Sequence, residues 1–545
     1  MRKLLLNIKK TGNIGKTAGL ALLLVSIVSC EDFLQEEPKG QLMPETFFSG
    51  KNDIDMALYA LYKTAAESTQ EHDFVMNAWA GDDIGTHPAS NKAEMREFDR
   101  YSVSPNSKWM GNTWQQKWGL IRAANFVING VEKTPGVDPA YIRTALAQAS
   151  YWRAYAYFYL VQCWGPLPKL TENKVDYNAP LASVEEIFNL IVADLKIAEE
   201  TPPQYNTAPW AMNGYNVAVG QAAAKATLAY VYLSMAGWPL NKTEYYALAA
   251  AKAKEVIDGV ENGTYRNALL DEYWKIHSWE YNNKNTEVLL AHYYSLDWGW
   301  GQCNVSAVSE VLQDAGDNGW GDSCGEILFW KNFPEGPRKE ATYAPKTLRP
   351  SDNSLQDWWW DTDPPSRPVV NPWFMKAAEG PRGVEFDYRK GASQGRGDGW
   401  GEKSHHIVRL AEVYCWYAEA LGRAGQTDPK AVELLNKVRN RADGVQSNIY
   451  PTGMAPAQLA EAAYNEHGWE ICGYNWGNIA TRYFDLFRMN RVAAHFESRK
   501  QNPLLEVAPG VWRKEAVTVE GTWSDDKMYA PYPAFDVLLN PNLKR

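Results

Sequence analysis

Tryptophan stands beside glycine and aspartate in several short stretches of the second half of the chain. They read Asp297-Trp298-Gly299-Trp300-Gly301, Asn318-Gly319-Trp320-Gly321-Asp322, Asp357-Trp358-Trp359-Trp360-Asp361 and Gly399-Trp400-Gly401. Nine of the chain's 24 tryptophans fall between Trp298 and Trp400. A neutral oligosaccharide offers C–H faces and hydroxyl groups, so a site for it needs flat aromatic rings flanked by carboxylates, amides or arginine. These stretches have that chemistry.

We expect ligand contacts from two regions. In the tryptophan-rich span the candidate residues are Trp298, Trp300, Trp320, Asp322, Arg338 and Trp359. The second region is the loop Asn77–Pro88, which combines Trp79 with the adjacent carboxylates of Asp82 and Asp83. Long loops on a rigid scaffold are where binding residues usually lie.

Each of these residues also has a purely structural interpretation. Loop tryptophans often plug a scaffold or cover helix ends, and alternating burial within 358–360 would leave one or two of its rings free at most. Asp82 and Asp83 can instead cap the following turn. These alternatives stay open at the level of sequence.

The same composition also suits a glycoside hydrolase, which needs a pair of carboxylates at a set distance. The 65 acidic residues offer many pairs and no reason to choose one. There is no Gly-x-Ser-x-Gly elbow, P-loop, HExxH or zinc-type cysteine spacing. We therefore predict a binding protein without catalytic residues, metal or cofactor. A repeat scaffold that binds only protein is the third class, with the tryptophans as interface anchors.

The N-terminus has the pattern of an export signal. Residues 1–16 carry five basic side chains and no acidic one, and an apolar run follows from Ala18 to Val28. The run is shorter than the roughly 20 apolar residues that span a bilayer, and this order of segments is typical of a signal peptide. Cys30 follows Ile27-Val28-Ser29 directly, which matches a bacterial lipobox and predicts a lipid anchor on its sulfur. A plain secretory signal with an incidental cysteine is the alternative.

Charge and cysteine content narrow the partners further. Removal of residues 1–29 changes the formal charge from −10 to −15, and no basic stripe is present, so nucleic acid is not an expected partner. Cys163, Cys415 and Cys472 lie in segments predicted to be helical and are expected to be buried. Cys303 and Cys324 lie in glycine-rich loops and can pair as a disulfide in an oxidising compartment.

The elements that must position the loops are helices. Apolar residues recur at three-and-four spacing from Asn52 onward, and further helices are predicted at 114–128, 141–164, 184–199 and 215–235. Gly165-Pro166-Leu167-Pro168 ends the third of these five helices. His405 and His406 are expected to enter the helix that follows them. Arg409, Glu412 and Glu419 are expected to form buried ion pairs on that helix.

Two stretches share a helix–glycine–helix plan. One has Gly237 between residues 228–233 and a second helix, and the other has Gly425 between residues 417–421 and a second helix. Small residues at the contacts make both similar to tetratricopeptide pairs, which need stacked neighbours to bury their faces. The predicted fold class is therefore all-α, a tetratricopeptide-like scaffold interrupted by a long loop-rich insertion.

The expected domain organisation follows. Residues 1–29 are the signal peptide, 30–50 a lipidated tether and 51–545 one compound domain. Within that domain the scaffold covers 51–288 and 407–490, and the insertion covers about 289–406. More than a hundred residues of loop are improbable as a mere connection, because most connections are short.

An ordered set of motifs runs along the chain: 148–158 with 165–168, Arg409–Tyr414 with Ala418–Ala420, Leu435–Ala442, Arg482–Arg488, and Tyr532-Pro533 with Asn540–Leu543. This set resembles the motifs of the SusD/RagB family. The family's "ER" helix is represented here by Glu466-His467, and the chain stops at Lys544-Arg545. Both departures concern local packing and the extreme C-terminus.

The resemblance implies a lipoprotein anchored in the outer membrane and facing the cell exterior. It implies a function of capturing oligosaccharides and passing them to a SusC-like TonB-dependent transporter barrel. Other members of the family accept peptides or different nutrients, so a peptide ligand is the alternative. In this family, loops at the two regions named above commonly form the binding surface.

Overall fold

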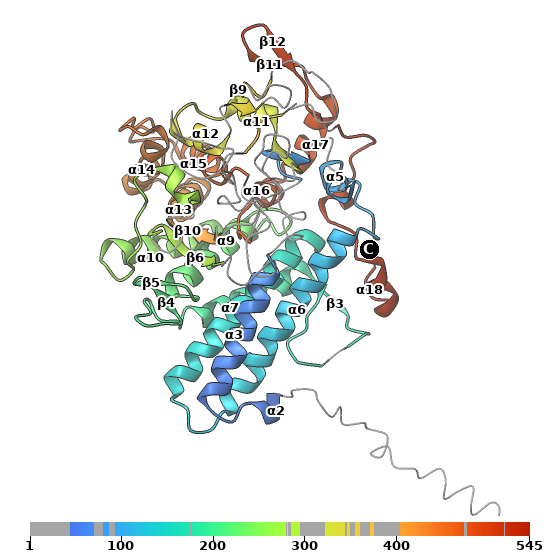
Figure 1. Cartoon of the computed structure of the whole chain (residues 1–545), viewed down its shortest axis with the longest axis vertical. Coiled ribbons are helices and arrows are strands. Elements are labelled where there is room, and N and C mark those ends of the chain that lie inside the picture. The colour runs from blue at the N-terminus through green and yellow to red at the C-terminus, as the bar shows by residue number, and fades with distance from the viewer. Residues whose placement is uncertain are drawn as a thin grey trace, which may run out of the picture. The chain divides into compact units, whose positions relative to one another are not determined.

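The computed structural model describes residues 44–69, 80–86, 93–174, 176–278, 281, 285–294, 322–343, 346–348, 355–359, 371–374, 376, 404–473, 477–516 and 518–544. The chain divides into two units, Met1–Phe47 and Phe48–Arg545. The first contributes only helix α2 (Pro44–Phe47) to the described residues. The second is built mainly of helices joined by short strand pairs, as Figure 1 shows. Within the described residues, no helix combines the length and apolar character that a membrane crossing requires.

Three long helices lie side by side in the lower half of Figure 1: α3 (Lys51–Glu67), α6 (Lys108–Gly130) and α7 (Pro139–Trp164). α3 buries residues at the spacing predicted from sequence: Ile54, Ala57, Leu58, Leu61 and Ala65. α7 is the central helix, because every residue from Ala147 to its end is buried. The Asp138 carboxylate accepts from Ala140 N (3.0 Å) at its start. Gly165 ends it at φ 70°, a conformation that favours glycine.

The next helices are α8 (Val184–Ala198), α9 (Gln221–Ala236) and α10 (Tyr245–Glu261). α9 presents a buried series of small residues: Ala222, Ala223, Ala224, Ala226 and Ala229. Their size lets the neighbouring helices approach closely. α9 begins six residues later than predicted, because Tyr215–Asn216 forms strand β5 and pairs with β4 (Ala211–Met212).

The C-terminal half of the scaffold contains α13 (Leu410–Arg423), α14 (Pro429–Asp443) and α15 (Pro456–Ile471). α13 touches the start of α15 at Gly422, where an added Cβ would lie 2.4 Å from Pro456 O and 2.6 Å from Ala460 N. Only glycine permits this approach. The pairs α9–α10 and α13–α14 are the two predicted helix–turn–helix units, and the tetratricopeptide-like fold class is confirmed.

Two of the strand pairs join distant segments. β6 (Val288–His292) pairs antiparallel with β10 (His405–Arg409), with His292 opposite His405. These strands lie at the two predicted ends of the insertion, so it leaves and re-enters the scaffold at one place. His405 and His406 therefore lie in a buried strand and do not enter a helix as predicted. β1 (Ile84–Thr86) pairs antiparallel with β7 (Ser323–Gly325).

The remaining elements are short. Local strand pairs are β2 (Leu167–Pro168) with β3 (Leu181–Ala182), β8 (Thr347–Leu348) with β9 (Leu355–Gln356), and β11 (Leu505–Ala508) with β12 (Val511–Arg513). The short helices are α5 (Ala93–Asp99), α11 (Ile327–Asn332), α12 (Pro337–Thr342), α16 (Arg482–Arg488), α17 (Val492–Gln501) and α18 (Ala534–Leu539), with 3-10 turns η2 (Val131–Lys133), η3 (Tyr273–His277) and η10 (Asp525–Met528).

Candidate functional site

The two loop regions singled out from the sequence meet in one antiparallel strand pair. Ile84, Gly85 and Thr86 lie opposite Gly325, Cys324 and Ser323 respectively. The Glu326 amide extends the pairing by donating to Asp83 O (3.1 Å). This ladder joins segments about 240 residues apart, and it pairs residues 84–86 of the 77–88 loop with residues 323–325 of the insertion.

Asp82 and Asp83 anchor this loop to the scaffold. Asp82 accepts two hydrogen bonds from Arg482 of α16, at 2.9 and 2.8 Å. Asp83 is 2 % exposed and accepts from Gly473 N (2.7 Å). Burial, with a smaller contribution from the Asp82 charge, raises the pKa of Asp83 to about 7. Burial of Asp83 contradicts the expectation that its carboxylate meets ligand hydroxyls. For Asp82, whose side chain is 25 % exposed, the pair with Arg482 favours the anchoring role.

Arg499 of α17 clamps the same region. Its guanidinium donates to Gly81 O (3.1 Å) and Ile84 O (3.0 Å). It also pairs with Glu326 (Nε–Oε1 2.6 Å) and donates to Asp99 O (2.7 Å). Burial raises the pKa of Asp99 to about 6 even though Arg499 opposes the shift. The buried Arg499 guanidinium thus ties together three separate segments, residues 81–84, Asp99 and Glu326.

Two predicted residues lie in or beside β7. Asp322 is 1 % exposed, so its carboxylate does not face an open surface. Cys324 is a buried free thiol whose sulfur donates to Gly85 O (3.6 Å). The possible pairing with Cys303 stays a prediction, because Cys303 lies outside the described residues. Cys163, Cys415 and Cys472 are buried free cysteines, as predicted.

An aromatic cluster lies close to this ladder along the chain. Trp330 of α11, which directly follows β7, lies 5.2 Å from Trp358 and 5.8 Å from Trp359 between ring centroids. Trp358 is 1 % exposed, whereas Trp330 and Trp359 are half-buried. The alternation predicted for the triplet is thus seen in its two described members. Trp359 and Trp330 are the two rings of this cluster that stay partly exposed, and the Lys339 ammonium lies 4.3 Å from the centroid of the Trp330 ring.

A cavity of about 680 Å³ opens beside Ala80, at the described end of the 77–88 loop. Tyr101, Tyr483 and Tyr532 line it, and their hydroxyls are already bonded to the backbone oxygens of Ala80, Met528 and Pro166. These three tyrosines therefore offer ring faces rather than free hydroxyl groups to the cavity.

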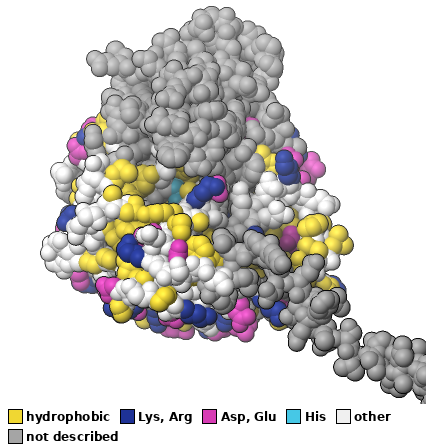
Figure 2. All heavy atoms as spheres, turned by 60° about the horizontal axis from the view of Figure 1, so that its bottom comes forward, with side chains coloured by type: hydrophobic (Ala, Val, Ile, Leu, Met, Phe, Trp, Pro, Cys, Tyr) yellow, Lys and Arg dark blue, Asp and Glu magenta, His cyan; other side chains and the backbone are white. Residues whose placement is uncertain are grey.

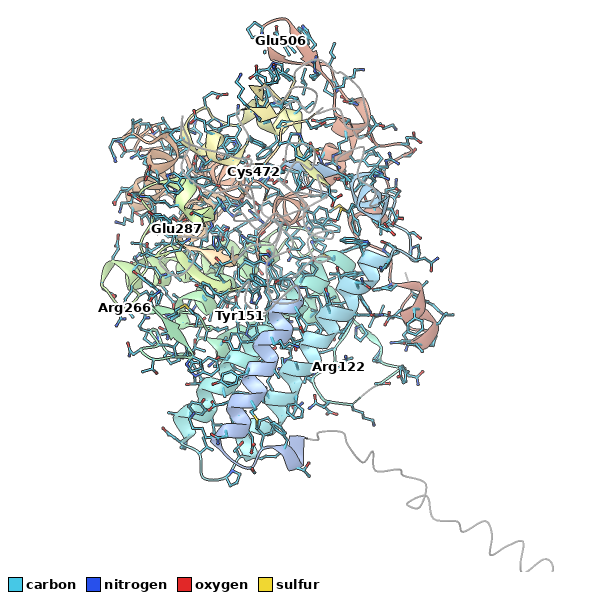
Figure 3. All side chains as sticks on the ribbon, in the orientation of Figure 1. Arg122, Tyr151, Arg266, Glu287, Cys472 and Glu506 are labelled. Atoms are coloured by element: carbon cyan, nitrogen blue, oxygen red, sulfur yellow. The ribbon has the colours of Figure 1, made fainter. Side chains whose placement is uncertain are left out.

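A buried ion-pair network ties the base of the insertion to the scaffold. The Glu470 carboxylate of α15 pairs with Arg409 (2.9 Å), Arg441 (2.6 Å) and Arg338 (3.0 Å). Glu287, beside β6 and labelled in Figure 3, pairs with Arg409 and Arg441 at 2.6 Å each. Burial alone would raise the pKa of Glu470, but Arg441, Arg409 and Arg338 together hold that pKa far below its ordinary value.

Arg338 needs a correction for this reason. It lies on α12 within the insertion, but it is 2 % exposed and also pairs with Glu466 (2.6 Å). Its guanidinium is buried and paired with Glu466 and Glu470, so it is not available to ligand hydroxyls. The predicted buried ion pairs of Arg409 and Glu419 are confirmed, since Glu419 pairs with Arg488 at 2.7 Å. Glu412 is buried as predicted and accepts from Asn478 (2.8 Å) and from Arg409 N (3.1 Å).

Six predicted residues lie outside the described residues: Cys30, Trp79, Trp298, Trp300, Cys303 and Trp320. Within the described part of the chain, no group of three or more histidine, cysteine or acidic side chains is arranged to hold a metal ion. At the ladder, the carboxylates of Asp82, Asp83, Asp99 and Glu326 are bonded to arginine or backbone partners.

Comparisons with known proteins decide the family. A family model described as "starch-binding associating with outer membrane" matches residues 32–233, and a model described as "SusD family" matches residues 383–545. The chain belongs to the SusD family. A SusD-like protein of Bacteroides ovatus is 25% identical over 565 residues, which cover 96% of each protein.

Solved structures show the same SusD fold. A structure determined with a xylogluco-oligosaccharide has a TM-score of 0.68 at 22% identity and covers 90% of this chain and 98% of its own. Surface glycan-binding protein A of Bacteroides thetaiotaomicron has a TM-score of 0.68 at 19% identity and covers 92% and 99%.

Sequence reasoning on this SusD-family chain missed Trp330 and Arg499. Trp330 ends the apolar run Ile327–Trp330, which is typical of a buried segment, and no glycine or aspartate beside it indicates an exposed ring. Arg499 lies in an ordinary polar helix, and its role depends on backbone oxygens more than 400 residues away. Trp330 becomes a candidate only when the β1–β7 ladder is known, because its helix α11 directly follows β7.

Proposed function

We propose that this SusD-family protein captures neutral oligosaccharides at the cell surface and delivers them to a SusC-like TonB-dependent transporter. The binding site is formed by the 77–88 loop and the 289–406 insertion, with Trp79, Trp298, Trp300, Trp320 and Trp359 as ring contacts. To these we add Trp330. Asp82, Asp83, Asp322 and Arg338 hold the loops rather than the ligand.

The observation that carries the proposal is the β1–β7 pairing. Two segments chosen for their sugar-binding composition, and distant in sequence, end at the same strand ladder. The half-buried rings of Trp330 and Trp359 belong to the segment that follows it. The structure solved with a xylogluco-oligosaccharide and the surface glycan-binding protein have the same fold, which supports a glycan as the ligand class.

The first experiment is affinity electrophoresis of residues 31–545 through gels that contain one soluble polysaccharide each, followed by calorimetry on the hits. Selective retardation by one glycan supports the proposal and names the sugar. If no glycan retards the protein, peptide capture becomes the better reading, and the same calorimetry is repeated with a peptide mixture.

Variants then locate the site. Trp298→Ala and Trp320→Ala should each weaken binding, because a lost stacking ring removes about 1–3 kcal/mol of contact with a sugar face. Tyr177→Ala is the matched control, since Tyr177 is 57 % exposed in a scaffold loop. Full affinity in both tryptophan variants would move the site away from these loops.

Hydrolysis is the competing activity, and it is tested on the same glycan. We expect the reducing-end content of the bound polysaccharide to stay constant over hours of incubation. Hydrolysis that a single Asp or Glu substitution abolishes would replace binding with catalysis.

Lipid attachment at Cys30 places the protein on the outer membrane in this proposal. Mass spectrometry of the mature N-terminal peptide should show acyl chains on residue 30, and Cys30→Ser should release the protein from the membrane fraction. A water-soluble wild-type protein with an unmodified Cys30 would contradict the anchor.

The contact with the barrel is assigned to the scaffold face near α3. This helix begins 21 residues after Cys30, which keeps it within roughly 70 Å of the anchor. Met56, Tyr59 and Met212 are 52 %, 47 % and 41 % exposed there, and Figure 2 shows hydrophobic side chains gathered across this end of the scaffold. Met56→Glu with Tyr59→Glu should abolish co-purification with the barrel while glycan binding persists. Co-purification retained in that variant would place the interface elsewhere.

A further inference from the structure

A second and larger cavity lies on another side of the protein. It has a volume of about 1000 Å³ and is enclosed by the end of α10, the segment 267–274, α12, α13 and α14. Figure 1 shows α12 and α14 on the left of the view and α5 and α17, which contact β1, on the right. The volume is at the upper end of the range of sites that enclose a small-molecule ligand.

Tyr414 of α13 supplies a polar group that the fold does not use. The side chain is 6 % exposed, yet its hydroxyl has no hydrogen-bond partner among the described residues. It lines the cavity, where a ligand can reach it. Burial raises the pKa of Tyr414 to about 12, so the hydroxyl keeps its proton and can donate. The hydroxyl oxygen is not among the buried unpartnered atoms of the described residues, so it stays accessible from the cavity and can donate to a ligand acceptor in place of water.

Asn267 provides a fixed acceptor on the same wall. Its Nδ2 donates to Thr286 O (3.1 Å) and Val288 O (3.0 Å), which holds the amide in place. The amide oxygen has no partner among the described residues and remains an acceptor. Leu270 N donates to Glu287 Oε2 (3.2 Å), so this wall is fastened to the ion-pair network. Figure 3 labels Glu287 and also Arg266, the residue that precedes Asn267 in the sequence.

The charges around the cavity favour an uncharged ligand. Glu261 pairs with Lys430, while Asp271 and Glu272 each pair with Lys275 at 2.8 Å. Arg441, the buried cation of the lining, is committed to Glu287 and Glu470. Glu340 is exposed and has no ion pair among the described residues, so it can accept from ligand hydroxyls. Lys437, the other cation of the lining, pairs with Glu433 at 2.8 Å, so an anionic sugar would face carboxylates and only cations that already have ion-pair partners.

Trp274 adds an aromatic face. It is half-buried, it packs against the small cluster of Tyr273, Ile276 and Ala341, and its ring lies 5.9 Å from that of Tyr281. An indole fixed from behind at the wall of a cavity is the surface on which a sugar ring stacks.

We infer that this cavity is a second saccharide site, specific for neutral oligosaccharides and separate from the tryptophan loops. Tyr414 donates to a ligand hydroxyl, Asn267 and Glu340 accept, and Trp274 stacks against one sugar ring. The inference shares its ligand class with the proposed function but uses different residues. A second site raises the residence time of a long glycan, because two linked contacts act at high effective concentration.

The test is hydrogen exchange measured by mass spectrometry on the mature protein and on the Trp298→Ala/Trp320→Ala variant. Maltohexaose, cellohexaose, xylohexaose, laminarihexaose and mannohexaose are the probes, with hexagalacturonate as the anionic counterpart. We expect a neutral hexaose to protect segments 260–274 and 436–446 in both proteins and hexagalacturonate to protect neither segment. Tyr414→Phe should raise the hexaose concentration that gives half-maximal protection about 3- to 10-fold, as loss of one hydrogen bond does.

Trp274→Ala should abolish the protection, and Tyr177→Phe should leave it unchanged. Protection confined to the loops 77–88 and 295–321 would overturn the second site and leave the proposed function standing. Protection confined to 260–274 and 436–446 would support the second site and overturn the loop site of the proposed function. Protection in neither region by any probe would overturn both, and protection unaffected by Tyr414→Phe and Trp274→Ala would overturn the second site.

Discussion

Helix α9 and the surroundings of Glu470 hold the molecule together in opposite ways. α9 is packed on all sides through alanines and apolar side chains, with Lys225 as its sole ionisable side chain apart from tyrosines. Around Glu470, three arginines and two further carboxylates are buried together. Apolar packing has no preferred direction, whereas each guanidinium–carboxylate pair fixes two groups in distance and angle.

The difference teaches where positional accuracy is needed. The scaffold needs rigidity rather than a precisely oriented contact, and close packing of small residues provides that rigidity. The insertion must return its loops to one place, and non-directional apolar packing does not by itself fix their orientation. Directional charge pairs at its base fix that position, although their desolvation makes them a poor source of net stability.

The largest expected effect comes from Glu470→Ala. Removal of this carboxylate leaves Arg338, Arg409 and Arg441 short of a partner, and breaking a buried pair costs about 3–5 kcal/mol. Urea unfolding should show the loss. Glu461→Ala on the same helix is the control: its side chain is 46 % exposed and its pairs with Arg423 and Arg491 should contribute below about 1 kcal/mol. Equal losses of unfolding free energy in both variants would show that the buried and surface ion pairs contribute alike.

A cavity in the scaffold should destabilise without changing binding. Leu233→Ala in α9 removes a fully buried side chain and should cost about 2–4 kcal/mol in urea unfolding. At temperatures well below the melting temperature, the variant's affinity for the glycan that retards the wild type in electrophoresis should stay within twofold of the wild-type value, because no loop contact changes. Leu248→Ala, at a position 46 % exposed, is the control. A large affinity loss in Leu233→Ala would show that loop geometry depends on core packing.

Asp83→Asn should change how stability depends on pH. The pKa of Asp83 is about 7 in the folded protein against an ordinary value of 3.8, so the folded state binds a proton that the unfolded chain releases. This contribution is complete below about pH 4 and is lost as the pH rises through 7. Relative to the variant, the wild type should lose on the order of 2 kcal/mol between pH 5 and pH 8. Asp258→Asn, at an exposed position, is the control, and parallel profiles for wild type and Asp83→Asn would refute the shift.

The smallest effect is expected from Trp359→Ala. The ring is half-buried against Trp330 and Trp358, so the variant should lose about 1 kcal/mol of glycan affinity in calorimetry and little stability. Tyr177→Ala should show neither loss. A stability loss above the affinity loss would make Trp359 a packing residue of the insertion rather than a ligand contact.

The sequence alone predicted α3, α7, α8 and the two helical pairs, because the spacing of apolar and small residues, capping groups and glycine stops are local signals. It also indicated which loops carry aromatic residues and which family the ordered motifs resemble. It misplaced the start of α9 because the β4–β5 pair forms between short segments without a strand pattern.

Only the tertiary structure decided which polar residues are free. Asp82, Asp83 and Arg338 have the same local sequence character as ligand-binding groups, but their partners Arg482, Gly473 and Glu470 lie 400, 390 and 132 residues away. Burial and charge pairing depend on such distant contacts, and no local pattern encodes them. The same holds for Tyr414, whose unpartnered hydroxyl becomes meaningful only beside the cavity that α12, α13 and α14 enclose.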